Sequence, residues 1–222
     1  VIEVSRPLAG RRALYVAHIR NEADRCMEAV EETFHIGREL GTPVLLSHHK
    51  HMREKNFGQS VFTLQRIQEE MGCQCVSLDC YPYTASSTML HLDEERLQGR
   101  VTIASSEAHP ELQGRDLQDI ADQWGVSRVE ASRRLQPASA IYYSMDEADV
   151  QRILSFEPTM IGSDGIPTGE RPHPRLWGTF PRVLGRYSRD IGLFPLETAV
   201  WKMTGLTAQV FGLQERGVLD VG

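Results

Sequence analysis

Four short apolar runs recur along the chain, and polar residues capable of chemistry follow each of them. The runs are residues 13–17, 43–46, 75–78 and 159–162. Apolar runs of about four to eight residues without alternation are typical of strands buried on both faces, as in parallel sheets. The polar residues at or just beyond the ends of these runs are His18, His48, Asp79 and Asp164. The pattern therefore predicts four interior strands with reactive side chains at their carboxyl ends.

Amphipathic segments separate the first three runs. Apolar positions at spacings of three and four predict a helix from Met27 to Leu40, with Asn21 as its cap and Gly41 at its end. Ser60 is expected to cap a second helix that ends at Gly72. Strands alternating with helices of this length indicate consecutive βα units and a parallel sheet, either open or closed into a barrel. Active sites form at the carboxyl ends of the strands in both architectures.

The stretch from Tyr83 to Ser144 interrupts the alternation. It is polar, and it predicts a helix over residues 116–124 and a capping box at Ser127 and Glu130. An insertion between the third and fourth strands would lie over the carboxyl face, so we expect a lid. A Gly- and Pro-rich loop over residues 165–175 and a helical region reaching residue 213 follow.

Composition narrows the possible functions of the chain. Its 222 residues are 41% hydrophobic and 24% charged, as in an ordinary globular domain. A net charge of -6 offers no basic face for nucleic acid, and no apolar run is long enough to span a membrane. Without a signal peptide's apolar core, the expected compartment is the cytoplasm. We expect reduced thiols, with Cys73, Cys75 and Cys80 as buried hydrophobic residues.

His18 and His48 form the sharpest candidate pair. They lie 30 residues apart, about one βα unit, so neighbouring strands would bring both imidazoles within reach of one ion. A single strand-end histidine is more often a hydrogen-bonded structural residue, but the strand-end carboxylate of Asp164 favours a metal site. By itself, Asp164 could hold a metal, move a proton or form an Asx turn. The sequence therefore favours zinc at His18 and His48.

Other polar residues near these strand ends are weaker candidates for a role in the site. His49 and His51 lie beyond the apolar run and are interpreted as loop residues. Lys50 could contact a substrate carboxylate or be a solvated loop lysine. Tyr81 could donate a hydrogen bond to a carbonyl oxygen or its oxyanion. The segment 173–175 could bind an anion or form a stiff surface loop.

Taken together, six motifs in order resemble one known family. They are YVAHIRNE at residues 15–22, LSHHK at 46–50, LDCYPY at 78–83, IGSDG at 161–165, HPRLWGTF at 173–180 and KMTGL at 202–206. The combination resembles the N-acyl-D-amino-acid deacylases of the amidohydrolase superfamily. The resemblance runs through nearly the whole chain, and it is more specific than any spacing argument.

The resemblance implies a metal-dependent (β/α)8 barrel, an α/β fold, with a smaller β-sandwich. Residues 1–222 would be its C-terminal half, about strands five to eight, with residues 83–144 as a lid between strands seven and eight. His18 and His48 match the histidines that hold a tightly bound zinc. A second, weaker zinc site is an alternative that the resemblance leaves undecided. Asp164 matches the aspartate of the eighth strand, which serves as general base and acid next to the metal.

The resemblance also implies the substrate contacts. Lys50, Tyr81 and Ser87 match polar substrate-binding positions, and Tyr142 and Met145 match part of the acyl-group or side-chain pocket. The implied reaction is hydrolysis of a small molecule, an N-acyl-D-amino acid, to a carboxylate and a D-amino acid. Asp164 would take a proton from the attacking water and return it to the leaving amine.

The family uses further ligands, a His-x-His pair and a cysteine, that these 222 residues do not supply. We therefore expect a piece of a longer protein, lacking both ends, with little activity by itself. Alternatives within enzymes are a deacylase specific for N-acyl-D-glutamate or N-acyl-D-aspartate, with Arg96 as a candidate cation, or a related cyclic amidohydrolase. The alternative outside enzymes is a metal-binding module without turnover.

Overall fold

The computed structural model describes residues 1–167 and 171–221. Residues 168–170 of the loop predicted after Asp164 therefore lie outside the described part. The chain divides into two compact units, which are treated separately below. The first unit comprises Val1–Pro82, Asp146–Ser163 and Gly178–Gly222, and the second comprises Tyr83–Met145 and Asp164–Trp177.

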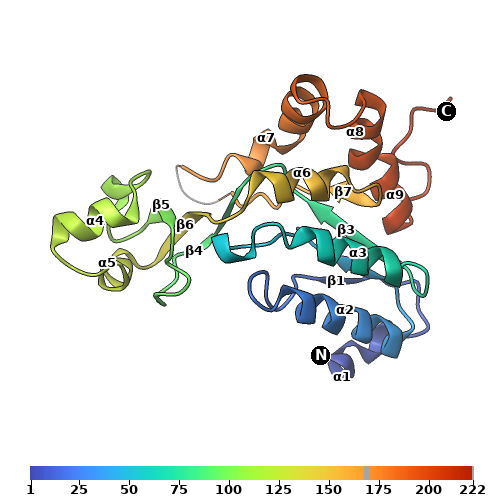
Figure 1. The fold of residues 1–222 in the computed structure, drawn as a ribbon, viewed down its shortest axis with the longest axis horizontal. Coiled ribbons are helices and arrows are strands. Elements are labelled where there is room, and N and C mark those ends of the chain that lie inside the picture. The colour runs from blue at the N-terminus through green and yellow to red at the C-terminus, as the bar shows by residue number, and fades with distance from the viewer. Residues whose placement is uncertain (168–170, 222) are drawn as a thin grey trace. The chain divides into compact units, whose positions relative to one another are not determined.

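A four-stranded parallel sheet forms the centre of the first unit (Figure 1). Its strands, in spatial order, are β1 (Tyr15–Ala17), β2 (Val44–Leu46), β3 (Val76–Cys80) and β7 (Thr159–Ile161). Ala17 pairs with Leu46 and Leu46 with Leu78, so β1, β2 and β3 are in parallel register toward one edge. The four predicted strands and their parallel pairing are confirmed. Asp79 differs from the prediction, because it lies inside β3 rather than beyond it.

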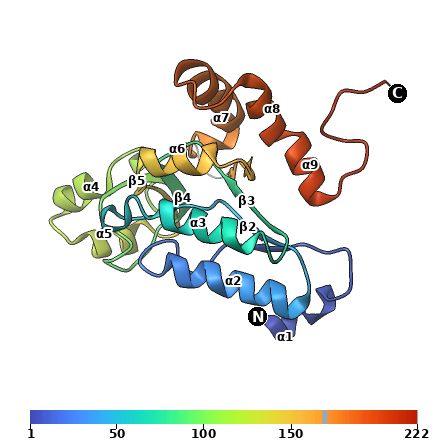
Figure 2. The ribbon, with the colours of Figure 1, turned by 45° about the vertical axis from the view of Figure 1, so that its right-hand side comes forward.

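Helices accompany these strands. In chain order they are α1 (Ile2–Ser5), η1 (Arg6–Leu8), α2 (Cys26–Leu40), η2 (Glu54–Asn56), α3 (Ser60–Glu70), α6 (Glu147–Ser155), the π-helix η4 (Val183–Asp190), α8 (Leu196–Met203) and α9 (Gly205–Phe211). Figures 1 and 2 show α2, α3 and α6 in a row alongside the strands. α8 and α9 pack against β7. α7 (Arg175–Arg182) begins in the second unit and ends in the first.

The first two long helices follow the predicted periodicity but not the predicted caps. α2 buries Ala29, Val30 and Phe34 and ends at Gly41, whose φ of 58° is the left-handed conformation that glycine adopts readily. Asn21 does not cap α2. Its Oδ1 instead accepts from the amides of Ala23 and Arg25 in the preceding turn.

Ser60 likewise does not cap α3. It is the first helical residue, and its hydroxyl donates to Asp149 of α6. A side chain from a neighbouring helix has therefore taken over the capping role that local sequence assigned to Ser60. Such a long-range partner has no local signature in the sequence.

An antiparallel three-stranded sheet forms the second unit, in the order β4 (Ala85–Met89), β6 (Ala138–Tyr143) and β5 (Arg100–Ser106). The unit also contains η3 (Pro110–Leu112), α4 (Leu117–Trp124) and α5 (Arg128–Leu135). The predicted helix is confirmed, with the Asp116 side chain accepting from the Gln118 amide. Ser127 accepts from the Glu130 amide, as a capping box requires. The three strands were not predicted, because residues such as Ser86, Ser87 and Thr88 in β4 carry little apolar signal.

The cysteines depart in part from expectation. All four are free thiols, and Cys26 and Cys80 are buried. The prediction that Cys73 and Cys75 are buried is wrong, because both are exposed between α3 and β3. In the part of the chain that the structure describes, no helix combines the length and the apolar character needed to cross a membrane.

Candidate metal centre

The structure brings His18 and His48 together at the edge of the parallel sheet. His18 follows β1 directly, and His48 lies two residues beyond β2. Because Ala17 and Leu46 are paired in register, both chains leave the sheet at the same edge. The two ring centroids are 4.5 Å apart, with an interplanar angle of 78°. His48 has a φ of 41°, an uncommon backbone conformation for a residue with a side chain.

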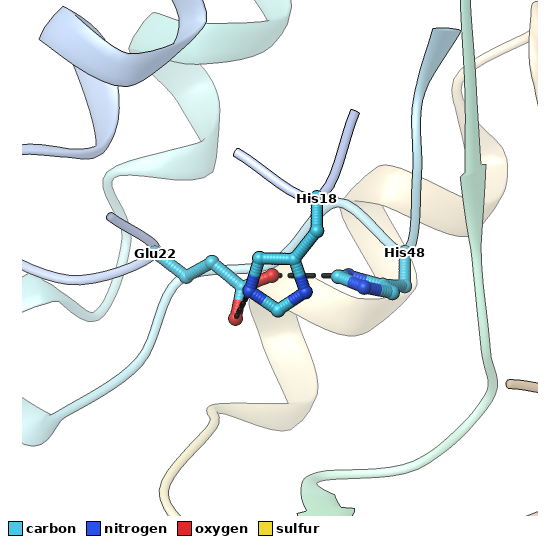
Figure 3. Close-up of side chains that lie close together, drawn as sticks. All are labelled: His18, Glu22 and His48. Atoms are coloured by element: carbon cyan, nitrogen blue, oxygen red, sulfur yellow. Dashed lines mark ion pairs between the residues drawn. The ribbon is translucent and has the colours of Figure 1, made fainter. Parts of the chain in front are cut away.

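Glu22, for which no role was predicted, completes the cluster. Figure 3 shows its carboxylate beside both imidazoles. Glu22 Oε1 lies 3.0 Å from His48 Nδ1, and Oε2 lies 3.7 Å from His18 Nε2. The one sequence feature that could have pointed to Glu22 is its spacing, because it follows His18 by four residues.

Lys50, in the loop after β2, forms an ion pair with the Glu22 carboxylate. Its Nζ lies 2.5 Å from Glu22 Oε1 and 2.6 Å from His48 Nδ1. Burial by itself would raise the pKa of Glu22, but the Lys50 charge and the His48 hydrogen bond outweigh it and lower that pKa to about 2. Lys50 is 5% exposed, which contradicts the interpretation of a solvated loop lysine. Its Nζ also lies 5.5 Å from the centroid of the buried Tyr81 ring.

The buried carboxylate of Asp79 accepts a hydrogen bond from the backbone amide of His48. Burial raises the pKa of Asp79, while the His48 backbone amide, the Ser47 hydroxyl and the Lys50 charge act in the opposite direction. A Cβ at Gly162 would collide with the Asp79 carboxylate. The first glycine of the IGSDG motif is therefore required by this close approach, since its φ is not positive.

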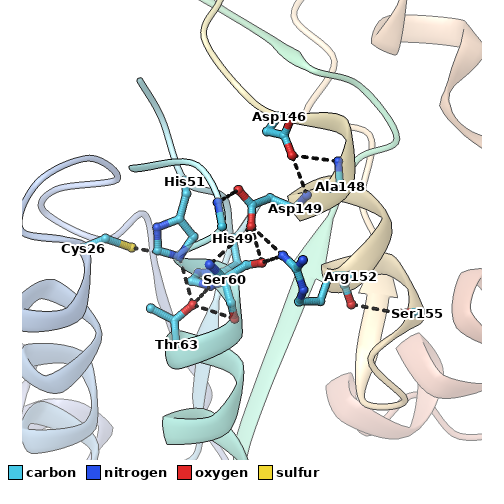
Figure 4. A network of polar contacts seen from close by, with 11 residues as sticks. Cys26, His49, His51, Ser60, Thr63, Asp146, Ala148, Asp149, Arg152 and Ser155 are labelled. Atoms are coloured by element: carbon cyan, nitrogen blue, oxygen red, sulfur yellow. Dashed lines mark hydrogen bonds and ion pairs between the residues drawn. The ribbon is translucent and has the colours of Figure 1, made fainter. Parts of the chain in front are cut away.

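His49 and His51 are loop residues, as predicted, but both are buried beneath the loop. His49 Nε2 and His51 Nε2 lie 3.1 and 2.9 Å from the Thr63 hydroxyl of α3 (Figure 4). Burial, followed by the charges of His51 and Lys50, lowers the pKa of His49 to about 3. These neutral histidines anchor to α3 the loop that carries His48 and Lys50.

Asp164 belongs to the second unit. It has a φ of 49°, so the left-handed residue of the IGSDG motif is the aspartate itself. Its Oδ2 lies 2.7 Å from Arg175 Nη1. Arg175 is 2% exposed, and it also donates to the Ser87 carbonyl at 2.8 Å. The interpretation of residues 173–175 as a stiff surface loop is therefore wrong, because His173 and Arg175 are both buried.

The remaining predicted substrate contacts also lie in the second unit. Ser87 is half-buried in β4. Tyr142 packs in the core of this unit, and its hydroxyl donates to the Met89 carbonyl and accepts from the His91 amide. Met145 is buried just beyond β6, with its amide bonded to Thr84. Their roles as substrate contacts stay predictions.

The donor set of the cluster fits a zinc ion. One ligand atom from each of His18, Glu22 and His48 lies within 4.8 Å of the others, and this is the one such group of three among the described residues. Imidazole nitrogen and carboxylate oxygen are the ligands that zinc uses in catalytic sites, commonly three with an open position. His18 is 68% exposed at its side chain, so the cluster is open on that side.

Comparison with known proteins gives one consistent result. No protein-family model matches the chain. The chain is 60% identical over 222 residues to a D-aminoacylase of Alcaligenes xylosoxydans xylosoxydans and spans 46% of that protein. A solved D-aminoacylase structure, described for the role of its binuclear metal centre, matches 97% of the chain at 61% identity with a TM-score of 0.94 and is covered to 46%.

A second solved structure carries a ligand. It is the N-acyl-D-glutamate deacylase of Bordetella bronchiseptica in complex with zinc and a phosphonate mimic of the tetrahedral intermediate. It matches the whole chain at 49% identity with a TM-score of 0.95, and the chain covers 47% of it. The chain thus spans about half the length of the relatives that it matches. By sequence and by its α/β fold, the chain is similar to about half the length of the D-aminoacylases, which are amidohydrolases.

Proposed function

We propose that the protein containing this chain uses zinc to hydrolyse the amide bond of N-acyl-D-amino acids. The observation that carries the proposal is the cluster of His18, Glu22 and His48 at the carboxyl edge of a parallel sheet. Relatives that match the chain are a D-aminoacylase and a zinc-containing N-acyl-D-glutamate deacylase. The four parallel strands support a place among consecutive strands of a (β/α)8 barrel, with the second unit as a lid.

The chain's own residues supply positioning and proton transfer. Zinc at this cluster would act as a Lewis acid toward the amide carbonyl and lower the pKa of water. Asp164 would take a proton from the attacking water and return it to the leaving amine nitrogen. Tyr81 would donate a hydrogen bond to the developing oxyanion.

Lys50 and three residues of the second unit would bind the substrate. The Lys50 ammonium has three donor hydrogens, so it can remain bonded to Glu22 and still meet a substrate carboxylate. Ser87 would be a polar substrate contact, and Tyr142 and Met145 would line part of the acyl-group or side-chain pocket. Asp164 would be held for its role by the ion pair with Arg175.

The test compares two stereoisomers in a protein of complete length. A chimera carries this chain in place of the matching residues of the Alcaligenes D-aminoacylase, and zinc content is measured beside hydrolysis of N-acetyl-D- and N-acetyl-L-methionine. We expect bound zinc and D-selective hydrolysis, lost by at least about 100-fold in Asp164→Ala. Asp190→Ala, at an exposed carboxylate, is the matched control and should leave the rate unchanged. Equal rates for both isomers, or full activity of Asp164→Ala, would refute the proposal.

A deacylase restricted to acidic side chains is the second candidate, because the Bordetella relative is an N-acyl-D-glutamate deacylase. Such specificity requires a cation for the substrate side chain. The candidate Arg96 is 60% exposed at its side chain, and its Nε lies 3.7 Å from Asp93. A panel of D-Met, D-Leu, D-Glu and D-Asp derivatives assayed with Arg96→Gln separates the two candidates. Selective loss of the D-Glu and D-Asp substrates would favour the acidic specialist.

A further inference from the structure

The loop between β2 and η2, residues 47–53, presents its side chains alternately to two sides. His48 and Lys50 point into the cluster, where both contact its carboxylate. His49 and His51 turn the other way and meet α3 (Figure 4). Because the four residues are consecutive, a contact that fixes the two rings on α3 also restricts the two residues that face the cluster.

One hydroxyl binds both of these rings. Thr63 Oγ1 lies 3.1 Å from His49 Nε2 and 2.9 Å from His51 Nε2. A hydroxyl has one hydrogen to donate and two lone pairs that accept, so it can serve two imidazoles at once. The three residues are 2% exposed or less, so water does not replace these bonds. Among the described residues, neither Nδ1 atom has a hydrogen-bond partner, and Thr63 is the one side chain hydrogen-bonded to the His49 ring.

The backbone of the loop is in an unfavourable conformation. His48 and Arg53 have φ angles of 41° and 77°. Such angles are uncommon for residues with a side chain, and they persist where the surrounding contacts enforce them. The His49 amide donates to a carbonyl of β3, and the Met52 amide donates to the Glu22 carbonyl, both at 2.7 Å. These two bonds tie down the backbone, whereas the hydroxyl on α3 fixes the direction of the rings.

We propose that Thr63, one turn into α3, is a positioning residue for the site. By binding both rings, its hydroxyl keeps the loop in the arrangement that turns His48 and Lys50 toward the cluster. The inference rests on the proposed function, in which His48 would bind zinc and Lys50 would bind the substrate carboxylate. α3 is then the scaffold that sets the position of this part of the site.

Two substitutions separate the hydroxyl from side-chain packing. Thr63→Val keeps the shape of the side chain and removes the hydroxyl, whereas Thr63→Ser keeps the hydroxyl and removes a methyl group. Thr33→Val is the matched control, because Thr33 is also buried and helical but donates to the Ala29 carbonyl within α2 at 3.0 Å. All three variants are made in the chimera described above, which has the complete length of the relative.

The first measurement reports the position of the rings without zinc or substrate. Diethyl pyrocarbonate modifies accessible imidazoles, and mass spectrometry locates the label. In the unaltered chimera and in Thr33→Val, His49 and His51 should stay protected while the exposed His35 reacts. Thr63→Val should raise the labelling of both rings, and Thr63→Ser should retain their protection. Equal protection in Thr63→Val and Thr33→Val would overturn the proposal.

The second measurement connects the loop to the site. Zinc affinity is measured by competition with a chromogenic chelator, and kcat and KM for N-acetyl-D-methionine are measured at saturating zinc. Thr63→Val should weaken zinc binding by about 10-fold, as for other residues that support a metal-binding histidine. It should also raise KM more than it lowers kcat, because Lys50 is displaced whereas Asp164 comes from another segment. Thr63→Ser should stay near the unaltered values, and an impairment equal to that of Thr63→Val would overturn the proposal.

Failure of this inference can be told apart from failure of the proposed function. If labelling and zinc affinity change as expected but the unaltered chimera does not prefer the D isomer, the function is refuted and Thr63 still fixes the loop. If the unaltered chimera is D-selective and Thr63→Val behaves like Thr33→Val in both measurements, the positioning role is refuted and the function stands.

Discussion

Removing the Asp149 carboxylate should destabilise the first unit more than removing any ordinary helix cap. Asp149 lies on α6 and is 2% exposed. Its Oδ2 accepts from the Gly58 amide at 2.7 Å, and its Oδ1 accepts from the Ser60 amide at 3.3 Å and from the Ser60 hydroxyl (Figure 4). Arg152 Nη1 donates to the same oxygen at 2.8 Å. Asp149 thus caps α3 from another helix.

The magnitude follows from the donors that Asp149→Ala would strand. A buried donor without an acceptor costs about 1–3 kcal/mol. Arg152 is 36% exposed at its side chain and can bond to water instead, so losing its hydrogen bond to Asp149 contributes little to the cost. The Ser60 hydroxyl can rotate to another acceptor, which leaves the two backbone amides as the main cost. We therefore expect Asp149→Ala to lower the free energy of unfolding by about 2–4 kcal/mol, and Asp149→Asn, which keeps one acceptor oxygen, by about half.

Urea unfolding of the full chain measures these differences. Asp146→Ala is the matched control, because Asp146 caps α6 through two backbone amides from a half-buried position. Its loss should cost about 1 kcal/mol, as for a typical N-cap. The reasoning is refuted if Asp149→Ala costs no more than Asp146→Ala. It is also refuted if Asp149→Asn is as damaging as Asp149→Ala.

Three further predictions concern stability. Lys202→Met should lower the free energy of unfolding by about 2–4 kcal/mol, because Nζ donates to the backbone carbonyls of Phe156, Glu157 and Thr159 at 2.6 to 3.0 Å; urea unfolding tests this. Gly162→Ala should lower the free energy of unfolding by about 1–3 kcal/mol, because the added Cβ would collide with Asp79. Gly185→Ala is the control, because the nearest atom to its added Cβ is the tip of Arg189 at 3.8 Å. Equal costs for the two variants would contradict this reasoning. Burial and a neighbouring arginine lower the pKa of His173 to about 4, so the unfolded chain binds the extra proton and stability falls as pH drops from about 6.5 toward 4, by about 2 kcal/mol at pH 5. Unfolding at pH 8 and pH 5 should show a smaller loss for His173→Asn.

Much of the metal centre could be predicted from strand ends alone. His18 and His48 follow apolar runs one βα unit apart, and parallel pairing in register then places their imidazoles side by side. Glu22 could not be found in this way, because it follows no strand. Its role depends on the contact with Lys50, which reaches it from the loop after the next strand.

The burial of several polar side chains could not be predicted from the sequence either. Lys50, His49 and His51 lie in a polar stretch that reads as a solvated loop, but Thr63 of α3 and the Glu22 carboxylate hold them inside. The polar strand β4 was missed for a related reason. Its pairing with β6 is made by backbone hydrogen bonds, which leave no apolar pattern in the side chains.

The sequence by itself determined the α/β fold class of this chain. Uninterrupted apolar runs specify strands buried on both faces, and periodic apolar positions specify the helices between them, because hydrophobic burial acts locally through these repeats. Only the tertiary structure decided which polar groups meet. Asp149 caps a helix that Ser60 was expected to cap, and Glu22 balances Lys50 beside two histidines, since such contacts depend on distances between segments far apart in the chain.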